Sequence, residues 1–192
     1  MARENKTIYA VLGLLMISPM SGYDMKKKID MGLSFFWNEN YGHLYPVLSK
    51  LEKQGLIAKD VNDVERRPER NVYKITRTGK QELAGWFPKK NDTVKFRSEL
   101  MLKLFFGSHA EVNTLIFMVD QEKQQHEVLL RTYADLEKQI LEENYRDEDR
   151  TFWHITLQNG RFFSQSQIAW CEETLKALKK IKLSPKKRKS IS

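Results

Sequence analysis

The sequence predicts a mainly α-helical protein with a small β-hairpin, organised as two domains. Three observations support this fold class. Apolar residues recur at helical spacing along most of the 192 residues, two short β-favouring segments flank a polar loop between residues 56 and 76, and a polar stretch at residues 88–92 separates two helical regions. Because 41% of the side chains are apolar, the chain can form one or two globular domains.

Two helices are expected at the start of the first domain. Residues 4–17 are apolar almost all round, which predicts a buried helix that ends before Pro19. Ser21 can cap a second helix that ends near Gly32, and Asp24, three residues later, approximates a capping box. On this second helix we expect Tyr23, Ile29 and Leu33 to face inward and Lys26, Lys27 and Lys28 to face outward.

A third helix follows, for which Asn38 or Asn40 is a candidate cap and Gly55 a candidate C-terminal stop. Its apolar residues keep the spacing of one helical face: Leu44, Val47, Leu48 and Leu51. Pro46 lacks a backbone donor, so it fits only if the regular helix begins within about one turn before it; otherwise it kinks the helix.

A two-stranded hairpin is predicted next, with residues 56–61 and 72–76 as its strands and residues 62–71 as a long polar loop. Thr78 is expected to cap a short helix that reaches Trp86, and residues 88–92 form the best linker. We therefore predict one domain at residues 1–90, a second at residues 91–184, and a disordered basic tail at residues 185–192.

The second domain is predicted to be helical throughout. An amphipathic stretch covers residues 93–106, a break follows at Gly107, and a long helix runs from about residue 110 to 144. Apolar residues on this long helix alternate spacings of three and four, and only Glu122 and His126 interrupt them. A charged turn at residues 147–150 leads to a last helix over about residues 151–181.

The formal net charge of +8 is concentrated in the first domain. Residues 1–90 carry 16 basic and 10 acidic side chains, whereas the other 102 residues carry 17 and 15. The first domain is therefore the part of the chain expected to bind a polyanion.

Several classes of protein are disfavoured. Cys171 is the single cysteine, which allows no intramolecular disulfide and favours a reducing, cytoplasmic location. The apolar run at residues 8–17 is half of the roughly 20 residues that span a bilayer, and Glu4 and the following SPMSG disfavour a secretory signal, so we expect no membrane partner. Motifs of phosphate-binding loops, serine hydrolases and zinc proteases are missing from the sequence, so we expect no enzyme, cofactor or metal.

Three helices followed by a hairpin is the element order of a winged helix-turn-helix domain. In such a domain the third helix enters the major groove and the hairpin, or wing, reaches along the DNA backbone. The excess of basic residues falls in the same part of the chain. Order and charge together predict binding to double-stranded DNA.

Residues 8–87 closely resemble the PadR family of bacterial transcriptional regulators. The matching stretches are YAVLGLL from residue 9, SGYDM from residue 21, YGHLYPVLSKLEKQGLI from residue 41 and RNVYKITRTG from residue 70. In length and pattern the second domain resembles the longer C-terminal domain of one branch of that family. The resemblance implies a homodimeric DNA-binding repressor, often released by a phenolic or other aromatic molecule, with a proline just inside the recognition helix.

The candidate DNA contacts lie on three segments. The recognition helix offers Tyr41, Gly42, His43 and Tyr45 near its entering end and Ser49 and Lys50 one turn later; the wing offers Arg66, Arg67 and Arg70; the second helix offers Lys26 and Lys27. Tyr45 could instead brace the wing, and His43 could be an exposed residue of the cap turn. Acidic neighbours make the wing a loop of mixed charge.

A dimer interface is favoured for the second domain over packing within one chain. One winged domain contacts only a half-site, so a two-fold protein suits a palindromic operator. The candidate interface residues are Val112, Leu115, Val119, Leu129, Tyr133, Leu136, Ile140, Phe162 and Phe163.

A pocket for a small aromatic effector is a further possibility, with Trp153, Phe163 and Trp170 as candidate lining residues and an ordinary core as the alternative. The main alternative to a DNA-binding regulator is a winged-helix module that docks an acidic protein partner. Removal of the wing arginines distinguishes the two, because operator affinity depends on them only in the DNA-binding model.

Overall fold

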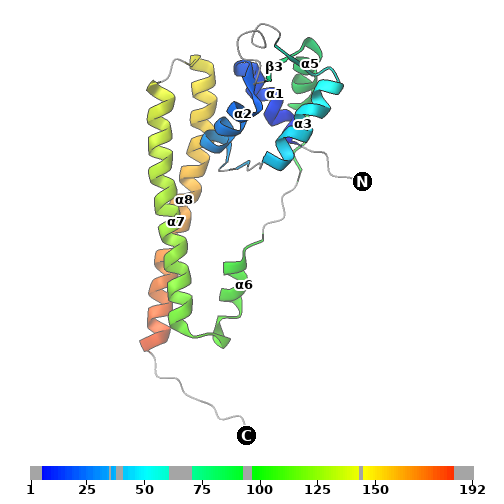
Figure 1. Cartoon of the computed structure of the whole chain (residues 1–192). Helices are drawn as coiled ribbons and strands as arrows, with labels where there is room; N and C mark the ends of the chain where they lie inside the picture. Colours follow the sequence, from blue (N-terminus) through cyan, green and yellow to red (C-terminus); the bar gives the residue numbers. More distant parts are fainter. Residues whose placement is uncertain are drawn as a thin grey trace. The chain divides into compact units, whose positions relative to one another are not determined.

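The computed structural model describes residues 6–34, 36–37, 41–60, 71–92, 97–142 and 145–183. The chain divides into two compact units, Met1–Thr93 and Val94–Ser192. Both are mainly helical, and the first also contains a small antiparallel sheet (Figure 1). The predicted fold class is therefore confirmed.

The first unit contains the predicted helices and a sheet of three strands. Its elements are α1 (Thr7–Ile17), β1 (Met20–Ser21), α2 (Gly22–Lys28), the π-helical turn η1 (Ile29–Leu33), α3 (Tyr41–Lys53), β2 (Ile57–Lys59), β3 (Val72–Ile75) and α5 (Arg77–Trp86). In the sheet, β3 lies between β1 and β2 and is antiparallel to both. The register pairs Met20 with Tyr73 and Ile57 with Ile75. The prediction of a hairpin alone missed β1, because two residues are too few for an alternating pattern.

The helix α3 is held by the apolar face that its spacing predicted. Its four apolar residues are at most 4% exposed: Leu44, Val47, Leu48 and Leu51. Gly55 ends the helix with φ +68°, a conformation that favours glycine. The backbone N–H of Leu56 donates to Leu51 O at 2.9 Å and that of Gly55 donates to Glu52 O at 3.0 Å, which is the Schellman pattern.

Two details differ from the predictions. Thr76, not Thr78, caps α5: its hydroxyl accepts from Gly79 N at 3.1 Å and donates to Gly55 O at 2.7 Å. Pro46 lies five residues after the start of α3, more than one turn inside it. Its missing donor leaves the carbonyl of Gly42 without the usual helical bond, and Gly42 is exposed, so water can solvate that carbonyl.

The second unit is an antiparallel helical hairpin with a short helix in front of it in sequence. Its elements are α6 (Glu99–Phe105), the 3-10 turn η2 (Gly107–His109), α7 (Val112–Glu142) and α8 (Asp147–Leu183), and α7 and α8 lie side by side (Figure 1). Residues 147–150, predicted as a turn, form the first turn of α8, where their acidic side chains suit the positive end of a helix. Among the described residues, no helix is apolar enough over a sufficient length to cross a bilayer.

Cys171 lies in the small core of the second unit, together with Leu115, Val119, Leu175 and Leu178. It is 0% exposed, and burial raises the pKa of its thiol. The raised pKa lowers the fraction of the reactive thiolate, and burial keeps alkylating agents away from the sulfur. We therefore expect iodoacetamide to leave Cys171 unmodified in the folded chain and to label it in denaturant. Mass spectrometry measures the two extents; rapid labelling of the folded chain would show that this core opens readily.

Candidate nucleic-acid interface

The exposed face of α3 carries hydrogen-bonding side chains opposite the buried apolar face. His43, Tyr45, Ser49 and Lys50 are exposed, as is Gly42, and Tyr41 begins the helix. The recognition-helix candidates whose side chains are described are thus placed on one accessible surface. Hydroxyl, imidazole and ammonium groups in this arrangement can donate to base edges or to phosphates.

Tyr45 has contacts within the protein and also faces solvent. Its side chain is 52% exposed. A Cβ built on Gly22 would lie 3.0 Å from Tyr45 Cε1 and 3.0 Å from Leu48 Cδ1, so α2 and α3 approach closely at this glycine. Burial raises the pKa of Tyr73 on β3, and the nearby Glu52 and Tyr45 raise it further. Tyr45 therefore lies close to both α2 and the sheet while half of it stays accessible.

The orientation of α2 differs from the prediction at two residues. Lys26, expected outside, is 8% exposed, and its ammonium group forms a close ion pair with Asp30. Tyr23, expected inside, is 53% exposed. The buried positions are Gly22, Met25, Lys26 and Ile29, which places Lys26 one turn from the contact between Gly22 and α3. Of the two lysines proposed to reach DNA, Lys27 is exposed and Lys26 is buried; Lys28, expected outside, is half-buried.

The capping box at the start of α2 is confirmed. Ser21 Oγ accepts from Asp24 N at 3.2 Å, and Asp24 Oδ2 accepts from Ser21 N at 3.4 Å and from Ser21 Oγ at 2.6 Å. The carboxylate of Asp24 is thus directed at Ser21. This fixes the first turn of α2 beside α3.

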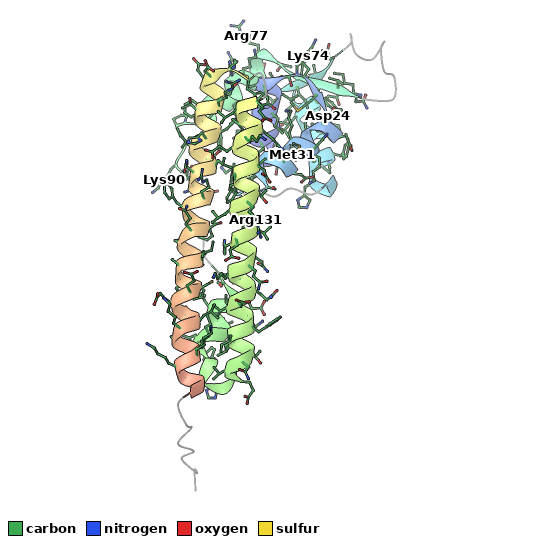
Figure 2. The ribbon with its side chains drawn as sticks, turned by 90° about the vertical axis from the view of Figure 1, so that its left-hand side faces the viewer. Asp24, Met31, Lys74, Arg77, Lys90 and Arg131 are labelled. Atoms are coloured by element: carbon green, nitrogen blue, oxygen red, sulfur yellow. The ribbon has the colours of Figure 1, made fainter. Side chains whose placement is uncertain are left out.

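The base of the wing carries paired charges. Lys59 Nζ lies 3.8 Å from Glu52 Oε1, and Lys74 Nζ lies 3.5 Å from Asp60 Oδ1. Lys74 and the exposed Arg77 project from the sheet and from the start of α5 (Figure 2). The wing arginines Arg66, Arg67 and Arg70 lie outside the described residues.

The residues predicted for a dimer interface separate into two groups. Leu115, Val119 and Tyr133 are buried by packing within the chain, and Val112, Leu129, Leu136 and Ile140 are partly exposed. Phe162 and Phe163 are 67% and 53% exposed. Much of the heptad-like pattern on α7 is therefore used within the α7–α8 hairpin.

The candidate effector residues are not brought together. Trp153 packs edge-on against Tyr145 with ring centroids 4.6 Å apart, and Trp170 packs on the core that contains Cys171. These two tryptophans lie on the same helix, α8, about 25 Å apart along it at 1.5 Å per residue. Phe163 instead packs edge-on against His126, with centroids 5.7 Å apart. A single pocket cannot contain all three.

His126 and Glu122 form a polar cluster between α7 and α8 that the sequence did not predict. His126 is 8% exposed; its Nδ1 lies 3.2 Å from Ser164 Oγ and its Nε2 lies 3.5 Å from Glu122 Oε1. Ser164 is 0% exposed, which closes it to a substrate. Within the described residues, no three His, Cys, Asp or Glu side chains are grouped to hold a metal ion.

Two family models match successive parts of the chain. The model of the transcriptional regulator PadR-like family matches residues 11–85, and the model called virulence activator alpha C-term matches residues 96–179. Each match falls within one of the two compact units.

Two relatives of this chain are also described as transcriptional regulators. The negative transcriptional regulator PadR of Bacillus subtilis is 37% identical over 103 residues, which cover 52% of this chain and 56% of the relative, so the chain spans about half the length of that protein. A probable transcriptional regulator of Mycobacterium tuberculosis is 24% identical over 181 residues, which cover 88% of this chain and 96% of the relative.

Solved structures share the fold of the whole chain. The crystal structure of B. subtilis PadR in complex with operator DNA has a TM-score of 0.75 at 22% identity and covers 91% of this chain and 99% of that one. The structure of that protein with p-coumaric acid gives the same values. These likenesses bear out the prediction of a winged helix-turn-helix domain followed by a helical domain. The chain is thus similar to the PadR-like family of transcriptional regulators, whose model matches residues 11–85 in its first unit.

Proposed function

We propose that this chain binds a specific DNA operator through α3 and the wing and represses transcription. The observation that carries the proposal is the division of α3 into a buried apolar face and an exposed face of hydrogen-bonding side chains, from Gly42 to Lys50. A helix held in this way presents its polar face to the major groove without rearrangement. The operator complex of the structural relative in B. subtilis supports the choice of DNA as the partner.

Repression is the proposed direction of control, because the relative that is 37% identical is a negative regulator. The C-terminal family model is named for a virulence activator, so an experiment must distinguish repression of transcription from activation. A reporter gene behind the bound promoter should become more active when the chain is deleted. Lower reporter activity after deletion would indicate an activator. Since its target is chromosomal DNA, we place the protein in the bacterial cytoplasm.

A homodimer on a palindromic operator is the second part of the proposal. The apolar residues of α8 that stay accessible keep a spacing of three and seven: Phe152 is 67%, Ile155 57% and Phe162 67% exposed. Such a row on a long helix is suited to packing against a second copy. We assign the interface to this row and to Phe163, and add the partly exposed Val112, Leu129, Leu136 and Ile140 of α7.

A small aromatic effector is the third part. It is supported by the p-coumaric acid complex of B. subtilis PadR. An effector can release the operator only if it binds one dimer geometry better than the other. Trp153, Phe163 and Trp170 would then belong to separate contacts, since they lie too far apart along α8 for one ring-sized site.

The arginines of the wing provide the test of the proposal that α3 and the wing bind DNA. Changing Arg66, Arg67 and Arg70 together to alanine should weaken operator binding and lower the slope of log affinity against log salt by about 0.9 for each phosphate that the chain no longer neutralises. Fluorescence anisotropy at several salt concentrations measures both quantities. Lys138, Lys176 and Lys179 of the second unit, changed together to alanine, remove the same charge as a control and should leave the slope unchanged. Full operator affinity in the arginine variant would favour the module that docks an acidic protein.

A further inference from the structure

We propose that Tyr23 is a further DNA-contacting residue, which donates its hydroxyl to a backbone phosphate beside Lys27. The inference rests on the proposed function and names an additional part of the same binding surface. It starts from the orientation of α2, which places Tyr23 outside and Lys26 inside.

The two side chains lie on one face of α2. Residues 23 and 27 are one helical turn apart, so their side chains point the same way. Tyr23 is 53% exposed and Lys27 is exposed as well. The neighbouring face, with Gly22, Met25 and Lys26, is buried. Tyr23 and Lys27 therefore form an accessible pair at the edge of the contact between α2 and α3.

This pair adjoins the recognition helix. Gly22, the residue before Tyr23, is the point where a Cβ would approach Tyr45 Cε1 to 3.0 Å. Tyr45 and Ser49 are one turn apart on α3, and both are exposed. The exposed face of α3 thus borders α2 at Gly22, the residue next to Tyr23. In a helix-turn-helix domain the helix before the recognition helix crosses the DNA backbone, so this border is where phosphates are expected.

The charges of α2 and η1 permit an anionic partner at this border. The two described carboxylates of this segment are Asp24 and Asp30, and both are engaged: Asp24 accepts from Ser21 Oγ at 2.6 Å, and Asp30 forms the close pair with Lys26. Lys27 contributes an exposed positive charge. A tyrosine hydroxyl is a neutral donor, so it can bind a phosphate without adding to the salt dependence that Lys27 creates.

The test uses the full chain and three single variants. Tyr23→Phe removes only the hydroxyl, Lys27→Gln removes the charge, and Lys80→Gln on α5 is the control for loss of an exposed lysine elsewhere. The probes are the DNA directly upstream of the chain's own gene and an unrelated duplex of equal length. Anisotropy titrations over a range of salt give affinity and salt slope, and thermal unfolding reports stability.

Tyr23→Phe should bind both duplexes roughly three- to tenfold more weakly, as expected for the loss of one hydrogen bond, with an unchanged salt slope and an unchanged melting temperature. Equal weakening follows because phosphate contacts carry no sequence information. Lys27→Gln should lower the slope by about 0.9, and Lys80→Gln should match the original chain.

Three results would overturn the inference while leaving the proposed function intact: full affinity in Tyr23→Phe, weaker binding of the operator alone, or weaker binding together with a lower melting temperature. The second result would make Tyr23 a base contact, and the third would give it only a structural role. If the original chain binds neither duplex, the proposed function itself fails.

Discussion

Replacing Gly79 by alanine is expected to lower the free energy of unfolding of the first unit by about 3 kcal/mol, as for severe overpacking of a core. A Cβ at this position would lie 2.1 Å from Leu56 O and 2.9 Å from Ile75 Cγ1. Leu56 cannot move aside cheaply, because its carbonyl oxygen accepts from Thr76 N at 3.1 Å and from Thr76 Oγ1 at 3.1 Å. The added methyl group must therefore break the junction between α5 and the sheet.

Gly85→Ala is the matched control in the same helix. Gly85 has no atom within 4 Å of a built Cβ, so alanine fits without displacing a neighbour. The higher helix propensity of alanine should then stabilise the unit by about 0.5 kcal/mol. Urea unfolding followed by circular dichroism measures both variants. Equal stability of Gly79→Ala and the original chain would contradict the close packing of α5 on Leu56.

Removing the second unit is expected to have the largest effect on DNA binding. A chain of residues 1–93 keeps the whole apolar core of the first unit, including Leu12, Met25, Leu44 and Leu48, and should fold by itself. It should be a monomer that reads one half-site. Losing the linked second half-site should weaken binding to the complete operator by about 10²- to 10⁴-fold.

Sedimentation equilibrium and anisotropy titration test this expectation on the same sample. Thermal unfolding of the shortened chain provides the control, since a cooperative transition shows that the fragment has folded. A folded fragment that is still dimeric would place the interface in the first unit. A folded monomer that binds the operator as tightly as the full chain would contradict the two-fold model.

The sequence predicted α3 well because several local signals agree there. The spacing of Leu44, Val47, Leu48 and Leu51 identified the buried face, and Gly55 marked the end of the helix. The capping box of α2 was equally readable, because both of its members lie within one turn. The candidate contacts on α3 were predicted from their place near the entering end of the helix, and those whose side chains are described lie on the exposed face opposite the buried one.

The sequence did not predict correctly which face of α2 is buried. The helix has seven residues and continues as a π-helical turn, so its apolar pattern is too short and too irregular to fix a phase. Three consecutive lysines add to the ambiguity: Lys26 is buried, and its ammonium group pairs with Asp30. A charge run alone does not indicate which of its members lies on the buried face of the helix.

The pattern on α7 posed a different problem. Spacings of three and four produce the same apolar stripe whether the partner helix belongs to the same chain or to a second copy. Leu115 and Val119 pack on α8 of their own chain. The rows that stay exposed, such as Phe152 and Phe162, become apparent only once the α7–α8 hairpin is in place.

The central claim is that this chain recognises a specific DNA sequence, and a competition titration tests it most directly. The labelled probe is the DNA directly upstream of the chain's own gene, the competitor is an unrelated duplex, and anisotropy is measured at about 50 and 200 mM salt. We expect nanomolar binding at the lower salt concentration that resists the competitor and weakens as salt rises. Weak binding that is equal for both duplexes would contradict sequence-specific recognition at this promoter and leave only electrostatic attraction.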